Sequence, residues 1–162
     1  MAKIAVVEDN TAVREELCGF IAKCAQESGR KLDVTPFADG SQIVEPYRPG
    51  FDIIFLDIEM PRLGGMPTAE RIRQLDPEVV LIFVTNMAQY AIRGYEVDAL
   101  DFVLKPVSYY QFSTKLERAL QRIQRRRGGQ VALQVGGGVQ LLDTDEICLL
   151  YTSPSPRDLS TS

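Results

Sequence analysis

Five short, mostly apolar runs divide this chain, and each run is bounded by turn-forming or polar residues. Short apolar runs between turn signals are typical of buried strands in a parallel sheet. The expected strands lie at about residues 3–7, 32–37, 52–57, 79–85 and 101–104.

Amphipathic segments separate the expected strands. Apolar residues recur in two of these segments at the three- and four-residue spacing of a helix that buries one face. The two stripes consist of Val13, Leu17, Phe20, Ile21 and Cys24, and of Phe112, Leu116, Leu120 and Ile123.

Capping and helix-breaking residues set the expected bounds of the helices. Asn10 or Thr11 can cap the first helix, and Gly29 can end it. Pro67 suits the first position of a later helix, because a first-turn residue needs no intrahelical N–H partner. Further helical segments are expected at about residues 41–47, 88–95 and 108–126. Strands that alternate with helices in this way predict an α/β fold, a doubly wound five-stranded parallel sheet.

The pattern changes after the arginine-rich end of the last helix. Residues 131–135 and 139–142 are apolar runs joined by a glycine turn, and this arrangement predicts a short C-terminal β-hairpin that begins a second domain. We explain Arg122 and Arg125–Arg127 as cations at the negative end of a helix rather than as a nucleic-acid patch.

Composition narrows the class of protein. The chain has 162 residues, 45% of them hydrophobic, and a net charge of −4, which suits one globular domain and the start of another without a general attraction to nucleic acid. No apolar run approaches the roughly 20 residues that span a bilayer, so we expect no membrane contact and a cytoplasmic location. Cys18 and Cys24 are expected to be ordinary core or boundary residues.

Histidine is absent from the sequence. Its absence excludes histidine-based catalytic triads, most zinc sites and a phosphohistidine carried on this chain. Any phosphoryl group must therefore come from a partner.

Ionisable residues follow three of the expected strands. Glu8 and Asp9 follow the first, Asp57 ends the third, and Lys105 follows the fifth. Because the carboxyl ends of parallel strands meet at one edge, three carboxylates and a lysine should converge there. Clustered carboxylates repel each other unless a cation lies among them, and oxygen ligands suit Mg²⁺. The pattern predicts a site for Mg²⁺ and a phosphoryl group, with Asp57 as the nucleophile.

The ordered set Glu8-Asp9, Asp57, Thr85 and Lys105-Pro106 closely resembles the receiver domain of bacterial two-component response regulators, which has a flavodoxin-like, CheY-like fold. The resemblance covers about residues 3–126. It implies that Asp57 accepts a phosphoryl group from the phosphohistidine of a sensor histidine kinase.

The same resemblance implies roles for the neighbouring residues. Asp9 should bind Mg²⁺ directly, Glu8 mainly through water, and Glu59 through its backbone carbonyl. Thr85 and Lys105 should contact the phosphoryl oxygens, and Thr85 and Phe102 should act as the switch. A cis peptide bond costs little free energy only when proline follows it, so Lys105-Pro106 is a candidate for one.

The stretch from Phe83 to Val107 is similar to receivers that precede a LytTR-type DNA-binding domain, as is Asp57-Ile58-Glu59-Met60-Pro61. The hairpin resembles the opening strands of that domain. The resemblance implies transcription regulation through promoter DNA, bound by a full-length LytTR domain that is mostly absent here, and a phosphorylation-dependent homodimer.

These resemblances divide the chain into four parts. Residues 1–126 are the expected receiver, 127–130 a linker, 131–147 the start of the LytTR-type domain, and 148–162 a non-native tail. Residues 148–158 can be encoded in frame by a common sequencing adapter. The alternative is a genuine disordered tail rich in serine and proline.

Two other functions fit parts of the sequence. One is a stand-alone receiver that only docks other proteins. The other is an enzyme, a phosphatase with an Asp nucleophile, but that class resembles an Asp-x-Asp motif on the first strand, whereas Asp57 lies on the third and Glu59 replaces the second Asp. We expect a phosphoacceptor rather than an enzyme that turns over a separate substrate.

Overall fold

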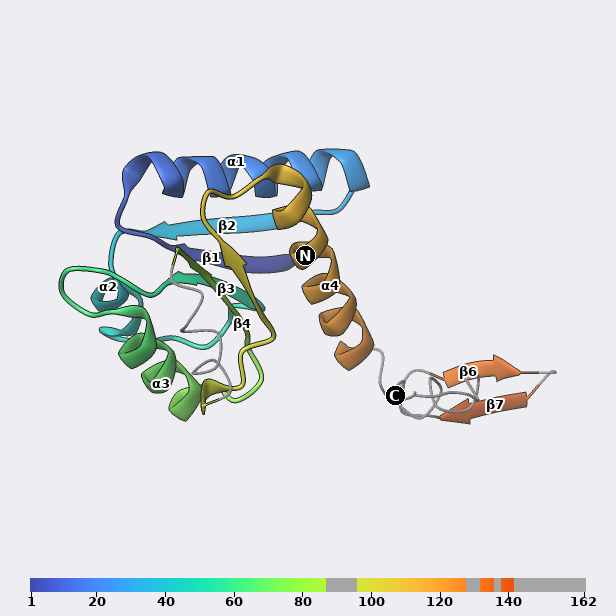
Figure 1. Ribbon diagram of the computed structural model, residues 1–162. Helices are drawn as coiled ribbons and strands as arrows, with labels where there is room; N and C mark the ends of the chain where they lie inside the picture. The colour runs from blue at the N-terminus through green and yellow to red at the C-terminus, as the bar shows by residue number, and fades with distance from the viewer. Residues whose placement is uncertain (87–95, 128–131, 136–137, 142–162) are drawn as a thin grey trace. The chain divides into compact units, whose positions relative to one another are not determined.

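A computed structural model describes residues 1–86, 96–127, 132–135 and 138–141 of the chain. The chain forms two units, residues 1–119 and 120–162. The first unit contains a five-stranded sheet in the order β2-β1-β3-β4-β5 with all neighbours parallel (Figure 1). Its strands are β1 (Ala2–Val7), β2 (Leu32–Phe37), β3 (Ile53–Asp57), β4 (Val80–Thr85) and β5 (Asp101–Leu104). The predicted fold is therefore confirmed.

Helices cover both faces of this sheet because the three central strands are apolar on both sides. On one face, Leu56 and Phe83 pack in a core with residues from α2 (Gly40–Val44) and α3 (Gly65–Leu75). On the other face, the ring centroid of Phe55 lies 4.7 Å from that of Phe112 in α4 (Tyr109–Arg127). Phe20 of α1 (Thr11–Ser28) also contacts Phe112, with the ring centroids 5.7 Å apart.

The first helix has the predicted caps. The Asn10 side chain accepts a hydrogen bond from the N–H of Val13 at 3.1 Å, and Gly29 ends the helix with φ at 70°. Glycine suits that left-handed conformation because it has no Cβ. The buried residues of this helix are Leu17 and Ile21, from the predicted stripe.

Two predicted helix bounds were wrong. Helix α3 begins at Gly65 rather than Pro67, because the chain closes its loop earlier, with Gly65 N–H donating to Ile58 C=O at 2.7 Å. Pro67 still lies within the first turn, where its missing N–H costs no helical bond. Helix α2 ends at Val44 rather than near Tyr47, since Pro46 disfavours a helical conformation at Glu45.

The C-terminal hairpin is present, with β6 (Ala132–Val135) paired antiparallel to β7 (Gly138–Leu141). The helix predicted at 88–95 and the tail predicted at 148–162 lie outside the described residues. Within the described ranges, no helix combines the length and apolar character needed to cross a membrane.

Replacing Asn10 by Ala is expected to lower the free energy of unfolding by about 1 kcal/mol, because one N–H in the first turn of α1 loses its acceptor. Urea unfolding followed by far-UV circular dichroism measures this loss. Gln26→Ala, at an exposed position of the same helix, is the control and should change little. Equal stability of Asn10→Ala and the wild type would contradict the capping role.

Candidate functional site

Three neighbouring strands of the sheet end at the predicted site. Val7 of β1 lies beside Leu56 of β3, so Glu8 and Asp9 emerge next to Asp57. Asp57 in turn lies beside Val84 of β4. The parallel register thus brings residues from distant parts of the sequence to one edge, as predicted.

The three carboxylates form a compact cluster. One carboxylate oxygen from each of Glu8, Asp9 and Asp57 lies within 4.8 Å of the others. Glu8 and Asp57 are buried, with exposed fractions of 1% and 5%, whereas Asp9 is exposed. The backbone of Glu8 is held as well, since Arg14 Nη1 donates a hydrogen bond to the Glu8 carbonyl at 2.7 Å.

Lys105 supplies the positive charge at this cluster. Its Nζ lies 2.8 Å from Glu8 Oε1 and 3.5 Å from Asp57 Oδ2. The Lys105 N–H donates to the Thr85 carbonyl at 2.9 Å, which places the lysine beside the end of β4. The Lys105–Pro106 peptide bond is cis, as predicted, and Glu45–Pro46 is cis without having been predicted.

Burial and charge shift the protonation of Asp57 in opposite directions. Burial raises its pKa most, the neighbouring carboxylate of Glu8 raises it further, and Lys105 lowers it in part, so that the pKa of Asp57 is about 7. Burial lowers the pKa of Lys105, but its contacts with Glu8 and Asp57 outweigh burial and raise it. The site therefore holds a permanent cation beside a carboxyl group that titrates near neutral pH.

Glu59 lies in the loop between β3 and α3, two residues after Asp57, and its side chain is exposed. Gly65 closes that loop against the strand end. A Cβ at Gly65 would lie 2.2 Å from the Asp57 carbonyl oxygen, so only glycine fits this approach.

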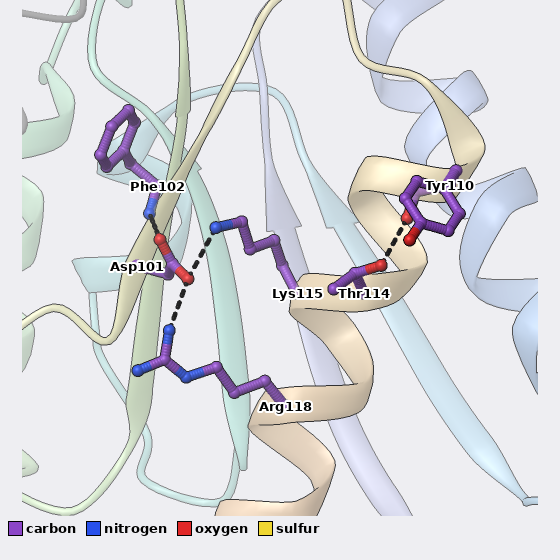
Figure 2. A network of polar contacts seen from close by, with 6 residues as sticks. All are labelled: Asp101, Phe102, Tyr110, Thr114, Lys115 and Arg118. Carbon is purple, nitrogen blue, oxygen red and sulfur yellow. Dashed lines mark hydrogen bonds and ion pairs between the residues drawn. The ribbon is translucent and has the colours of Figure 1, made fainter. Parts of the chain in front are cut away.

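The two predicted switch residues lie on neighbouring strands. Thr85 is buried at the end of β4, and Phe102 of β5 lies beside Phe83, half-buried against the core. Asp101 Oδ1 accepts a hydrogen bond from the Phe102 N–H at 2.9 Å (Figure 2). Asp101 Oδ2 accepts hydrogen bonds from Lys115 at 2.9 Å and from Arg118 at 3.0 Å. The Asp101 carboxylate thus joins the backbone of β5 to helix α4.

The residues present fit a divalent magnesium ion. Mg²⁺ prefers hard oxygen ligands, and the cluster offers three carboxylates from the ends of two strands. The two cysteines in the described part of the chain, Cys18 and Cys24, are half-buried on α1, as predicted. They contribute no ligand to this cluster.

Comparison with curated proteins gives relatives that are named as regulators. The chain is 33% identical over 134 residues to the transcriptional regulatory protein BtsR of Escherichia coli, covering 80% of this chain and 51% of that protein. It is 25% identical to the sensory transduction protein LytT of Bacillus subtilis, covering 99% and 69%. The chain thus spans about half the length of BtsR.

Solved structures and a family model agree with these relatives. The response regulatory domain of mrkE from Klebsiella pneumoniae matches with a TM-score of 0.68 and 26% identity, over 76% of this chain and 98% of that one. TrrA of Thermotoga maritima, solved in complex with Mg²⁺ and BeF, matches with a TM-score of 0.63 and 26% identity, over 74% and 99%. The model of the response regulator receiver domain matches residues 4–117. This chain therefore belongs to the response regulator receiver domain family.

Proposed function

We propose that Asp57 is a phosphoacceptor whose modification controls a transcriptional output. The observation that carries this proposal is the placement of Asp57 as a buried carboxylate with Glu8, Asp9 and Lys105 around it. A nucleophilic carboxylate that lies within a metal-binding cluster and contacts a fixed cation suits phosphoryl transfer, in which positioning and charge neutralisation provide most of the catalysis.

Glu8, Asp9 and Asp57, with the carbonyl of Glu59, would hold Mg²⁺. When bound, the metal would neutralise phosphoryl oxygens and keep Asp57 ionised. Lys105 would balance the remaining negative charge, because its Nζ lies 2.8 Å from Glu8 and 3.5 Å from Asp57.

The reaction transfers one phosphoryl group from a sensor histidine kinase. A carboxylate oxygen of Asp57 forms a bond to phosphorus as the P–N bond of the kinase phosphohistidine breaks, and the electron pair leaves with the imidazole nitrogen. Thr85 and Lys105 contact the phosphoryl oxygens. Movement of the Thr85 hydroxyl then lets Phe102 change position, which alters the surface near β5 and α4.

The output follows the receiver along the chain. We assign residues 1–126 to the receiver, 127–130 to a linker and 131–147 to the start of a LytTR-type domain, in line with the regulatory names of BtsR and LytT. The complete domain would bind promoter DNA, and phosphorylation would favour a homodimer. Asp57 itself takes up the phosphoryl group, so the protein is a phosphoacceptor rather than an enzyme that turns over a separate substrate.

Incubation with acetyl phosphate and Mg²⁺ is expected to add the mass of a single phosphoryl group, because the small donor needs no kinase contact. Intact-mass spectrometry measures the adduct. Omitting Mg²⁺ and adding EDTA is the control, and it should remove most of the adduct.

Two outcomes would contradict this function. A folded protein that binds Mg²⁺ but forms no adduct would be a docking module without phosphorylation. Continuous release of phosphate from a phosphate ester, with many turnovers per protein, would instead identify an Asp-nucleophile phosphatase.

A further inference from the structure

Asp39, at the start of α2, is a buried carboxylate that binds a second loop. Its exposed fraction is 6%. One of its oxygens accepts from the N–H of Ser41 at 2.9 Å and thereby caps α2. The carboxylate also accepts from the N–H groups of Arg62 and Leu63, each at 3.1 Å. One side chain thus joins the N-terminus of α2 to the loop between β3 and α3.

The residue after Asp39 packs against that loop as well. A Cβ on Gly40 would lie 1.9 Å from Thr68 Oγ1 and 2.6 Å from the carbonyl oxygen of Leu63. The backbone of α2 therefore lies directly against the loop and the first turn of α3. This contact is independent of the hydrogen bonds of Asp39, and it shows that the two segments are held at close range.

The loop has a separate anchor at its base. Gly65 N–H donates to the Ile58 carbonyl at 2.7 Å, and Thr68 Oγ1 donates to the Gly64 carbonyl at 2.8 Å. These bonds fix the two ends of the segment 58–64. Its outer part contains Arg62 and Leu63, and the two amides there have the Asp39 carboxylate as their acceptor.

The strength of these bonds comes from the charge on Asp39. Burial raises the pKa of Asp39, but hydrogen bonds from the N–H groups of Ser41, Arg62 and Leu63 outweigh it and lower the pKa overall. The carboxylate stays ionised at neutral pH. A hydrogen bond to an ionised acceptor is stronger than one to a neutral acceptor, so the charge on Asp39 strengthens its bonds to the N–H groups of Arg62 and Leu63.

We propose that Asp39 is a positioning residue for the metal site, which fixes the loop 58–64 so that the Glu59 carbonyl is held ready for Mg²⁺. The inference rests on the proposed function, because that function supplies the metal and the role of Glu59. A residue that orients a metal ligand without binding the metal itself can still matter for binding. Replacing such a residue typically weakens metal affinity by about 10- to 100-fold. Asp39 would act in this way through the loop backbone, three residues beyond Glu59.

The test distinguishes two roles of Asp39, its hydrogen bonds to the loop and its capping of α2. Asp39→Ser keeps a side-chain oxygen that can cap α2 through Ser41, but one short hydroxyl cannot also serve the amides of Arg62 and Leu63. The matched control is Asp76→Ser. Asp76 also accepts from two loop amides, those of Glu78 at 3.3 Å and Val79 at 3.2 Å. Asp76 lies just before the first residue of β4, whereas Asp57 is the last residue of β3, so the two are at opposite ends of the parallel strands.

Isothermal titration calorimetry with Mg²⁺ alone measures the affinity of each protein, with urea unfolding as a check on stability. Asp39→Ser is expected to bind Mg²⁺ about tenfold more weakly than the wild type. Asp76→Ser should lose stability but keep the wild-type affinity.

Each other outcome decides the matter. If Asp39→Ser binds Mg²⁺ as tightly as the wild type, Asp39 only stabilises the fold and the inference fails, while the proposed function stands. If Asp76→Ser weakens binding equally, the effect is general destabilisation and the inference also fails. If the wild type binds no Mg²⁺, the proposed function itself fails. Should Asp39→Ser not fold, Asp39→Asn, which keeps one acceptor oxygen, must bind more weakly than the wild type, and unchanged affinity would overturn the inference.

Discussion

Replacing Asp57 by Asn is expected to abolish phosphorylation and, at pH 8 without metal, to raise the free energy of unfolding by about 2 kcal/mol. The first effect follows from chemistry, because an amide is not the nucleophile that a carboxylate is. The second follows from the surroundings of Asp57. Its carboxylate is 5% exposed and lies beside Glu8, so ionising it inside the folded protein is unfavourable.

The pH dependence has a definite sign. The pKa of Asp57 is about 7 in the folded protein, against an ordinary value of 3.8. A carboxyl group with a raised pKa contributes stability at low pH, and this contribution is lost as the pH rises from about 4 through about 7. The advantage of Asp57→Asn over the wild type should therefore be largest at pH 8 and should vanish toward pH 4.

Urea unfolding across this pH range, followed by far-UV circular dichroism, measures the stability effect, and intact mass after acetyl phosphate treatment measures the chemical one. Asp98→Asn is the matched control, since it removes the same charge at an exposed position and asparagine tolerates the positive φ found there. Saturating Mg²⁺ should reduce or reverse the advantage, because the metal stabilises the wild type by binding to its folded state. A phosphoryl adduct on Asp57→Asn, or a stability advantage that grows toward low pH, would contradict this account.

Local patterns were sufficient to predict the strand ends. β2, β5 and the carboxyl end of β3 lie at the predicted residues, because short runs bounded by turn signals define buried strands without tertiary information. Once the strands are parallel, the meeting of Glu8, Asp9 and Asp57 follows from topology alone. The Asn10 cap and the Gly29 terminus were predictable for the same reason, since each depends on the chemistry of one residue in its local backbone.

Features that depend on contacts between distant segments were not predictable. The early start of α3 is set by the approach of Gly65 to the end of β3, and nothing within residues 64–67 alone favours Gly65 over Pro67 as the first helical residue. Likewise, Asp39 looks like an ordinary helix cap in the sequence. Its hydrogen bonds to Arg62 and Leu63 exist only because two loops, more than twenty residues apart in the chain, meet at one end of the sheet.

The division of roles between the two adjacent acids was also hidden. The resemblance assigns direct metal binding to Asp9 and a water-mediated role to Glu8. In the structure, Glu8 is the buried partner of Lys105, and Asp9 is exposed. Glu8 therefore also holds the lysine in place, and this role depends on a contact across 97 residues of sequence.

Replacing Lys105 by Met is expected to lower the free energy of unfolding by about 3 kcal/mol at pH 8 without metal, because it leaves two buried carboxylates without their cation. Lys105 Nζ lies 2.8 Å from Glu8 and 3.5 Å from Asp57, and its own side chain is only 20% exposed. Below pH 7 the loss should shrink, since Asp57 can take up a proton in place of the missing positive charge.

A double-mutant cycle with Asp57→Asn isolates the ion pair. In the Asp57→Asn background, Lys105→Met should cost less, because only the Glu8 carboxylate remains to lose its partner. The matched control is Lys115→Met, which removes one of the two cations on Asp101 while Arg118 keeps its contact (Figure 2). Its cost should be about 1 kcal/mol or less. Mg²⁺ should also restore more stability to Lys105→Met than to the wild type, since the metal supplies the charge that the lysine no longer provides. Equal losses for Lys105→Met in both backgrounds would show that Lys105 and Asp57 are not coupled, and the charge-balancing role of the lysine would then have to be abandoned.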